Sequence, residues 1–180
     1  IYGPKGIGFL YVNKDRDQLN INPLIDGGGH ENGLRSGTLN VPGIVGFGEA
    51  AKIASKLMTA DRTRELELRN RFIEKLTDQI DNFYINGDLT HRLAGNINIS
   101  FEGVNGDALL LNMDDIAVSN GAACSSAVKE PSYVLKAIGR TEKLAEASLR
   151  IGIGRDTTDD NIDYAVDKIC SVVSNLREIE

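Results

Sequence analysis

The sequence has few cysteines and no long apolar run. Only Cys124 and Cys170 occur among its 180 residues, and they lie far apart. Two distant cysteines favour a reducing compartment such as the cytoplasm, where thiols do not pair into disulfides. The chain has no stretch of about 18 consecutive apolar residues, and its N-terminus has no charged segment followed by an apolar one. We therefore expect no membrane span and no export.

The chain also lacks an excess of basic residues and the paired spacings of zinc ligands. Its formal net charge is -6, which argues against direct nucleic-acid binding through a broad basic surface. His30, His91 and the two cysteines show none of the short spacings that structural zinc sites use. We expect no metal site built by this chain alone, and surface or hydrogen-bonding roles for both histidines.

What is present indicates an α/β fold. The hydrophobic fraction of 41% is ample for a core, and strand-like segments alternate with helical ones. Strands are predicted at 7–12, 83–85, 96–101, 116–119 and 148–153. Helices are predicted at about 42–80 (one or two), at 107–113, between Pro131 and Gly139, and at 159–178 with Thr158 as the N-cap.

Residues 13–40 have no clear period, and a connector of this length is a candidate functional loop. Within it, Thr38 follows Arg35, Ser36 and Gly37. Their hydroxyls, guanidinium and backbone amides suit a phosphate group, although an ordinary turn would have the same composition.

The two cysteines have different surroundings. Cys170 falls on the apolar face of the last predicted helix, so we expect it in the core. Cys124 lies among the Gly, Ala and Ser residues of 119–127, where nothing would bury a thiol. Its neighbours leave two interpretations, a reactive nucleophile or a tolerated surface thiol.

Arg150 ends a strand pattern whose other members are apolar or tiny, so its charge needs a partner. Arginine binds carboxylates through two parallel hydrogen bonds, and the partner is either a substrate carboxylate or a structural Asp or Glu. Arg155 has the same capacity, but we expect it to lie in solvent.

Six motifs, taken in order, resemble the cysteine desulfurases of the NifS/IscS type; they are residues 1–6, 28–31, 35–39, 119–127, 130–135 and 148–150. The resemblance covers essentially the whole chain. It implies a pyridoxal-phosphate-dependent transferase of aminotransferase fold type I. Residues 1–42 would form the C-terminal end of the large cofactor-binding domain. Residues 43–180 would form the long linking helix and the small α/β domain that carries the cysteine loop.

The resemblance also implies roles for three residues. Such enzymes use pyridoxal 5'-phosphate to convert L-cysteine to L-alanine, leaving a persulfide on a protein cysteine that corresponds to Cys124. Arg150 would hold the substrate carboxylate, and Thr38 would reach the cofactor phosphate of the partner subunit in a homodimer. The sulfur would pass to an acceptor or iron-sulfur scaffold protein, for iron-sulfur cluster assembly or thiolation. A further hypothesis is a transient contact between Cys124 and a nascent iron-sulfur cluster.

One residue of the family pattern has no counterpart. The lysine that binds the cofactor precedes the first motif and would fall just before Ile1, and the chain starts without methionine. We therefore expect the later part of a longer enzyme. Two alternatives stay open: a non-enzymatic sulfur carrier or interaction module, and a related lyase acting on selenocysteine or cystine.

Overall fold

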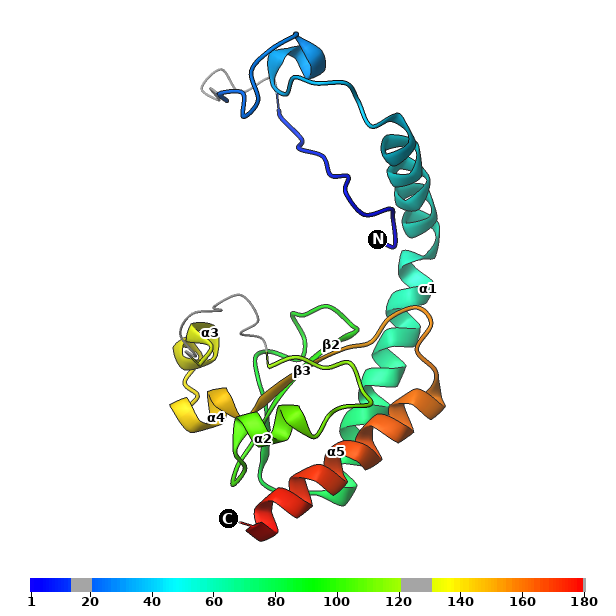
Figure 1. Cartoon of the computed structure of the whole chain (residues 1–180). Helices are drawn as coiled ribbons and strands as arrows, with labels where there is room; N and C mark the ends of the chain where they lie inside the picture. Colours follow the sequence, from blue (N-terminus) through cyan, green and yellow to red (C-terminus); the bar gives the residue numbers. More distant parts are fainter. Residues whose placement is uncertain (14–20, 121–130, 180) are drawn as a thin grey trace. The chain divides into compact units, whose positions relative to one another are not determined.

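The computed structural model describes residues 1–13, 21–120 and 131–179, which form two compact units (Figure 1). The first unit is Ile1–Met58 and the second is Thr59–Glu180. The elements in chain order are η1 (His30–Gly33), α1 (Val41–Gln79), β1 (Phe83–Ile85), β2 (Asn96–Phe101), α2 (Gly106–Leu111), α3 (Tyr133–Ala137), α4 (Glu142–Glu146), β3 (Ser148–Gly152) and α5 (Asp159–Ile179).

Helix α1 is a single helix of 39 residues, which confirms the helix predicted at about 42–80. Asn40 caps its start, because the side-chain oxygen accepts a hydrogen bond from the Gly43 amide at 3.1 Å. Pro42 is tolerated in the first turn, where no intrahelical partner is required for its missing N–H. Asn82 follows the helix with a φ of 54°, a left-handed conformation that asparagine adopts more readily than most residues.

The strand predicted at 7–12 was wrong. These residues form no regular element, and Phe9, Leu10 and Tyr11 are 77%, 74% and 77% exposed. A strand requires a neighbouring strand to complete its hydrogen bonds, and none of the described residues of this unit supplies one. The Phe9 ring instead lies 5.4 Å from the ring of Phe47 on α1.

The second unit is built on an antiparallel sheet with the strand order β1-β2-β3. Its register pairs Ile97 with Ile151 and Ile99 with Leu149, so these four apolar side chains share one face. That face packs on α5 and on the second half of α1 through buried residues that include Phe72, Leu76, Val166, Ile169 and Val173. Phe72 is fully buried, and burying a side chain of this kind stabilises the fold by about 1.5–3 kcal/mol.

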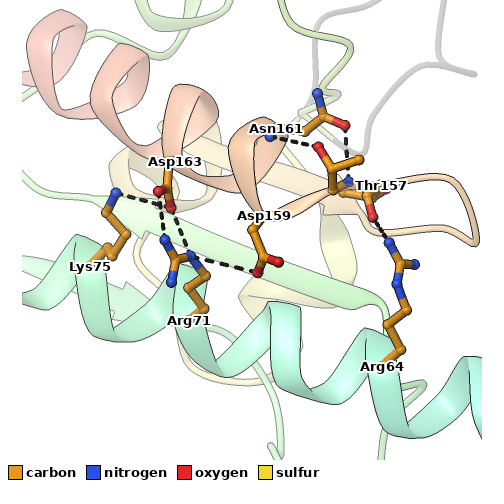
Figure 2. A network of polar contacts seen from close by, with 8 residues as sticks. Arg64, Arg71, Lys75, Thr157, Asp159, Asn161 and Asp163 are labelled. Carbon is orange, nitrogen blue, oxygen red and sulfur yellow. Dashed lines mark hydrogen bonds and ion pairs between the residues drawn. The ribbon is translucent and has the colours of Figure 1, made fainter.

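Polar contacts also join α1 to α5 (Figure 2). The Arg71 guanidinium donates to the two carboxylate oxygens of Asp163 at 2.8 and 2.6 Å, and Lys75 lies 3.0 Å from the same carboxylate. These hydrogen bonds, with Arg71 the larger contributor, lower the pKa of Asp163 to about 2. Seven residues before Arg71, about two helical turns earlier on α1, Arg64 donates to the carbonyl oxygens of Arg155 and Thr157.

Most elements of the second unit confirm the predictions, including the three strands β1, β2 and β3 and the helix α2. Thr158 caps α5 as predicted, with its hydroxyl accepting from the Asn161 amide at 3.2 Å. The strand predicted at 116–119 is reduced to an isolated bridge at Ser119. Arg155, expected in solvent, is instead half-buried and paired with Asp61, with nitrogen–oxygen distances of 2.6 and 3.0 Å.

The division by compactness falls between Met58 and Thr59, inside α1, and so lies further along the chain than the domain boundary predicted at 42/43. The part of α1 up to Met58 belongs to the N-terminal unit, because residues such as Pro4 pack directly on α1 at Gly46. The assignment of 1–42 and 43–180 to two domains stays a prediction. Among the described residues, no helix is long and apolar enough to cross a membrane.

Candidate functional site

The face of the sheet opposite the core carries polar side chains. Strand β2 contributes Asn98 and Ser100, and β3 contributes Ser148 and Arg150. The register places Asn98 opposite Arg150 and Ser100 opposite Ser148, because side chains alternate between the two faces of each strand. The alternation of Asn and Ile in 96–101 predicted the strand. It did not predict which face of the strand would carry a site, because that depends on the pairing of β2 with β3. Ser100 and its partner Ser148, for example, are 48 positions apart in the sequence.

Arg150 lies on β3, the edge strand, with its side chain exposed. Its guanidinium makes no hydrogen bond or ion pair with the residues that the structure describes, unlike Arg71, Arg140, Arg155 and Arg177. A structural Asp or Glu partner is therefore not found within the described ranges. An arginine in this state offers its donors to a ligand carboxylate.

The backbone of Arg150 is joined to Ser119 on the side away from β2. The Arg150 amide donates to the Ser119 carbonyl at 2.5 Å, and the Ser119 amide donates to the Arg150 carbonyl at 3.2 Å. Cys124 lies outside the described residues, five positions after Ser119 in the sequence. Ser119, which is bonded to Arg150, thus lies two positions in sequence before the segment 121–130 that contains Cys124.

Thr38 belongs to the first unit and is exposed. The residues around it differ in availability: Arg35 donates to the Gly37 and Thr38 carbonyls at 3.0 and 3.4 Å, and the amide of Ser36, a residue only 5% exposed, donates to the Ile25 carbonyl. The Thr38 hydroxyl makes no hydrogen bond with the described residues, so of this group it is the one best suited to an anionic oxygen.

Cys170 confirms its prediction as a core residue, since it is only 6% exposed. Burial is the main cause that raises the pKa of its thiol to about 11, and the nearby Asp167 carboxylate adds to the effect. A thiol with such a pKa is almost entirely protonated at neutral pH and is a poor nucleophile. Of the two cysteines, Cys124 alone remains a candidate for thiol chemistry.

The histidines have the surface roles that the sequence indicated. His91 is exposed and its Nδ1 lies 2.5 Å from Asp88 Oδ2, a contact that lowers the pKa of Asp88. His30 opens η1 and is exposed. Within the described ranges, no group of three or more His, Cys, Asp and Glu side chains is arranged to hold a metal ion.

Comparison with known proteins gives one consistent result. The family described as aminotransferase class-V matches residues 1–165. The chain is 52% identical over 179 residues to the cysteine desulfurase IscS of Rickettsia felis, an alignment that covers 99% of this chain and 43% of that protein. The chain therefore spans less than half the length of the curated relatives that it matches.

Solved structures agree. A NifS-like protein superposes with a TM-score of 0.80 at 34% identity, over 97% of this chain and 44% of the other. The structure described as SspA in complex with cysteine superposes with a TM-score of 0.60 at 34% identity, over 85% of this chain and 41% of the other.

Proposed function

Because the chain belongs to the class-V aminotransferase family, we propose that it is the C-terminal portion of a pyridoxal 5'-phosphate-dependent cysteine desulfurase. The observation that carries this proposal is the 52% identity to a cysteine desulfurase over 99% of the chain. The polar face of the sheet supports it, since it presents an exposed arginine whose backbone is bonded to Ser119, five positions before Cys124 in the sequence.

The described residues fit a phosphate-bearing cofactor at Thr38. Its exposed hydroxyl is available to a phosphate oxygen, and Gly37, with a φ of 107°, gives the turn a conformation that other residues rarely adopt. In the homodimer that we propose, this hydroxyl holds the phosphate of the cofactor bound by the partner subunit. When bound, pyridoxal 5'-phosphate supplies the electron sink that makes the substrate α-carbon acidic and its thiol labile.

Arg150 binds the carboxylate of L-cysteine in this proposal. Its planar guanidinium matches a carboxylate with two parallel hydrogen bonds, and β3 holds its backbone between Asn98 and Ser119. An arginine fixed on a strand orients an amino-acid substrate better than one on an irregular segment. The solved SspA complex contains cysteine, which supports the choice of substrate.

Cys124 receives the sulfur. Its thiolate forms a bond to the sulfur of bound L-cysteine, the carbon–sulfur bond of the substrate breaks, and the electron pair left on the carbon takes up a proton. The overall reaction converts L-cysteine and the Cys124 thiol into L-alanine and a Cys124 persulfide, balanced in atoms and electrons. The outer sulfur of the persulfide then passes to an acceptor or iron-sulfur scaffold protein in the cytoplasm, where it enters a nascent cluster, and Cys124 returns to a thiol.

The test is the mass of the Cys124 peptide after treatment with L-cysteine. The chain is measured alone and together with the upstream portion that supplies the cofactor-binding lysine, with pyridoxal 5'-phosphate present. We expect one added sulfur on Cys124 in the complete mixture only, none in the Cys124→Ser variant, and an unchanged result in the matched variant Cys170→Ser. Absence of the added sulfur from the complete mixture would remove Cys124 from the reaction.

A further inference from the structure

Asn86, the residue after β1, is a buried polar hub. It is 2% exposed, and every hydrogen-bonding group that it carries is used. Its amide donates to the Asn98 carbonyl at 2.8 Å, and its Nδ2 donates to Asn98 Oδ1 at 2.6 Å and to Ser100 Oγ at 2.8 Å. Its own carbonyl accepts from Arg92, and its Oδ1 accepts from Arg140 Nε at 2.5 Å. A buried asparagine satisfied in this way has one orientation.

Arg140 reaches this hub from the connection between α3 and α4. Besides the bond to Asn86, its Nη2 donates to the Ile85 carbonyl at 3.0 Å, and the guanidinium carbon lies 5.1 Å from the centre of the Tyr84 ring. One side chain thus contacts three consecutive residues that are more than fifty positions away in the sequence. No carboxylate pairs with it among the described residues, so the contact fixes geometry through directed hydrogen bonds.

A second connection runs from the hub to α4. Ser148 Oγ donates to the Leu144 carbonyl at 2.6 Å and lies 2.7 Å from Ser100 Oγ. A hydroxyl has one proton, so Ser148 gives its proton to Leu144 and accepts from Ser100, which in turn accepts from Asn86. The result is an ordered chain of hydrogen bonds from Asn86 across the polar face to α4, and such chains strengthen each member.

The segment from α3 to α4 is therefore attached twice to the sheet that carries Arg150. Tyr133, the first residue of α3, lies nine positions after Cys124, and Ser119, five positions before it, is bonded to Arg150. The described residues before and after the 121–130 segment are thus both hydrogen-bonded to the same sheet. On the C-terminal side of the 121–130 segment, the attachment through Arg140 is made by one side chain.

We propose that Arg140 is a positioning residue for sulfur transfer, which acts through Asn86 by fixing α3 and α4 relative to Arg150. The inference rests on the proposed function, because it assigns a role in delivering the Cys124 thiol to a substrate held by Arg150. It concerns orientation and not contact with the reacting atoms. Loss of the Arg140 side chain should therefore slow the transfer step and leave substrate binding intact.

The experiment uses the complete protein with pyridoxal 5'-phosphate bound and compares wild type with Arg140→Ala and Arg140→Lys. Arg177→Ala is the matched control, because Arg177 also donates to three distant groups, the carbonyls of Asp81, Asn82 and Glu102, each at 2.9 Å. Two quantities are measured: the steady-state constants for persulfide formation, and amide hydrogen exchange in α3, α4 and the sheet.

For Arg140→Ala we expect kcat to fall about tenfold with KM for L-cysteine unchanged within about twofold. Exchange of the Ile138, Gly139 and Arg140 amides, which donate to carbonyls of α3, should rise about tenfold while the amides of β2 and β3 keep their protection. Arg140→Lys, which retains one donor group, should recover part of the loss in kcat. Arg177→Ala should change neither kcat nor exchange in α3.

The inference is overturned by a normal kcat in Arg140→Ala, by unchanged exchange in α3, or by an equal loss in Arg177→Ala. It is also overturned by a rise in KM that accounts for the whole effect, since that places Arg140 in substrate binding. If the wild-type protein forms no Cys124 persulfide, the proposed function itself is contradicted. A wild-type protein that forms the persulfide while Arg140→Ala behaves normally contradicts only the role of Arg140.

Discussion

Arg150 and Ser119 exchange two backbone hydrogen bonds, at 2.5 and 3.2 Å, while the Arg150 side chain remains exposed. The bridge extends the sheet by one residue pair beyond β3, and the chain runs from it into the segment that contains Cys124. A residue with a fixed backbone and an available guanidinium is suited to binding, because only its side chain, and not its backbone, loses conformational freedom when a ligand binds.

Substitution of Arg150 tests its role directly. In the complete protein, Arg150→Gln removes the charge and the paired donors, so we expect KM for L-cysteine to rise about 10- to 100-fold. Arg150→Lys should recover only part of this, since an ammonium group does not reproduce the planar fork. Steady-state kinetics measure the effect, with Arg62→Gln as the control at an exposed position on α1. Unchanged KM in Arg150→Gln contradicts the assignment.

Thr38 should affect the cofactor and not the substrate. Thr38→Ala removes one hydrogen bond to a charged phosphate, which predicts a Kd for pyridoxal 5'-phosphate about tenfold higher. Thr38→Ser keeps the hydroxyl and should bind the cofactor almost normally. Absorbance titration of the complete protein measures both variants. Equal affinities for wild type and Thr38→Ala would remove Thr38 from the cofactor site.

Asp163 makes the stability of the second unit depend on acid pH (Figure 2). The folded-state pKa is about 2, below the ordinary value of 3.8, so the ionised carboxylate stabilises the folded form above about pH 4. As pH falls from about 4 to about 2, protonation removes this contribution. Asp163→Asn should unfold at lower urea concentration at pH 7 and show a smaller further loss on acidification.

The matched control for Asp163 is Asp159, whose carboxylate lies 3.8 Å from the Arg71 guanidinium and is largely exposed. Asp159→Asn should change the urea midpoint little, because exposed ion pairs contribute little to stability. If Asp163→Asn and Asp159→Asn give the same midpoint at pH 7, the contacts with Arg71 and Lys75 do not stabilise the packing of α1 against α5.

Cys170 should be unreactive until the protein unfolds. Its pKa of about 11, against an ordinary value of 9.0, leaves roughly 100-fold less thiolate at pH 8 than an unfolded chain has. Alkylation by iodoacetamide, followed by peptide mass, should therefore be at least that much slower in buffer than in concentrated urea. Rapid labelling of Cys170 in the folded protein would contradict its burial.

The sequence predicted the elements that depend on local pattern. The alternation of Asn and Ile in β2 and the cap at Thr158 are local features, and both are found in the structure. The strand at 7–12 was wrong because an apolar run does not reveal whether a partner strand is present. The Asn86–Arg140 bond was not predictable from pattern, since its partners are 54 positions apart and neither is apolar.

For the candidate site, the sequence indicated the residue types, but it did not show which of them have partners from distant parts of the chain. The composition of 35–38 indicated a phosphate group, but which of those groups remain available is decided by tertiary contacts, such as the bond from the Ser36 amide to Ile25. Likewise, Arg155 was expected in solvent, yet Asp61, 94 positions away, pairs with it, whereas the side chain of Arg150 is the exposed one.

The two faces of the sheet bear on how such a chain tolerates insertions and deletions. One extra residue within β3 would exchange the faces, directing Arg150 toward the apolar core and Leu149 or Ile151 toward the polar side. A residue added in a surface turn, such as the one containing Asp88 and His91, leaves the alternation of every strand intact. Related proteins should therefore differ in the length of their turns and agree in the length of β3.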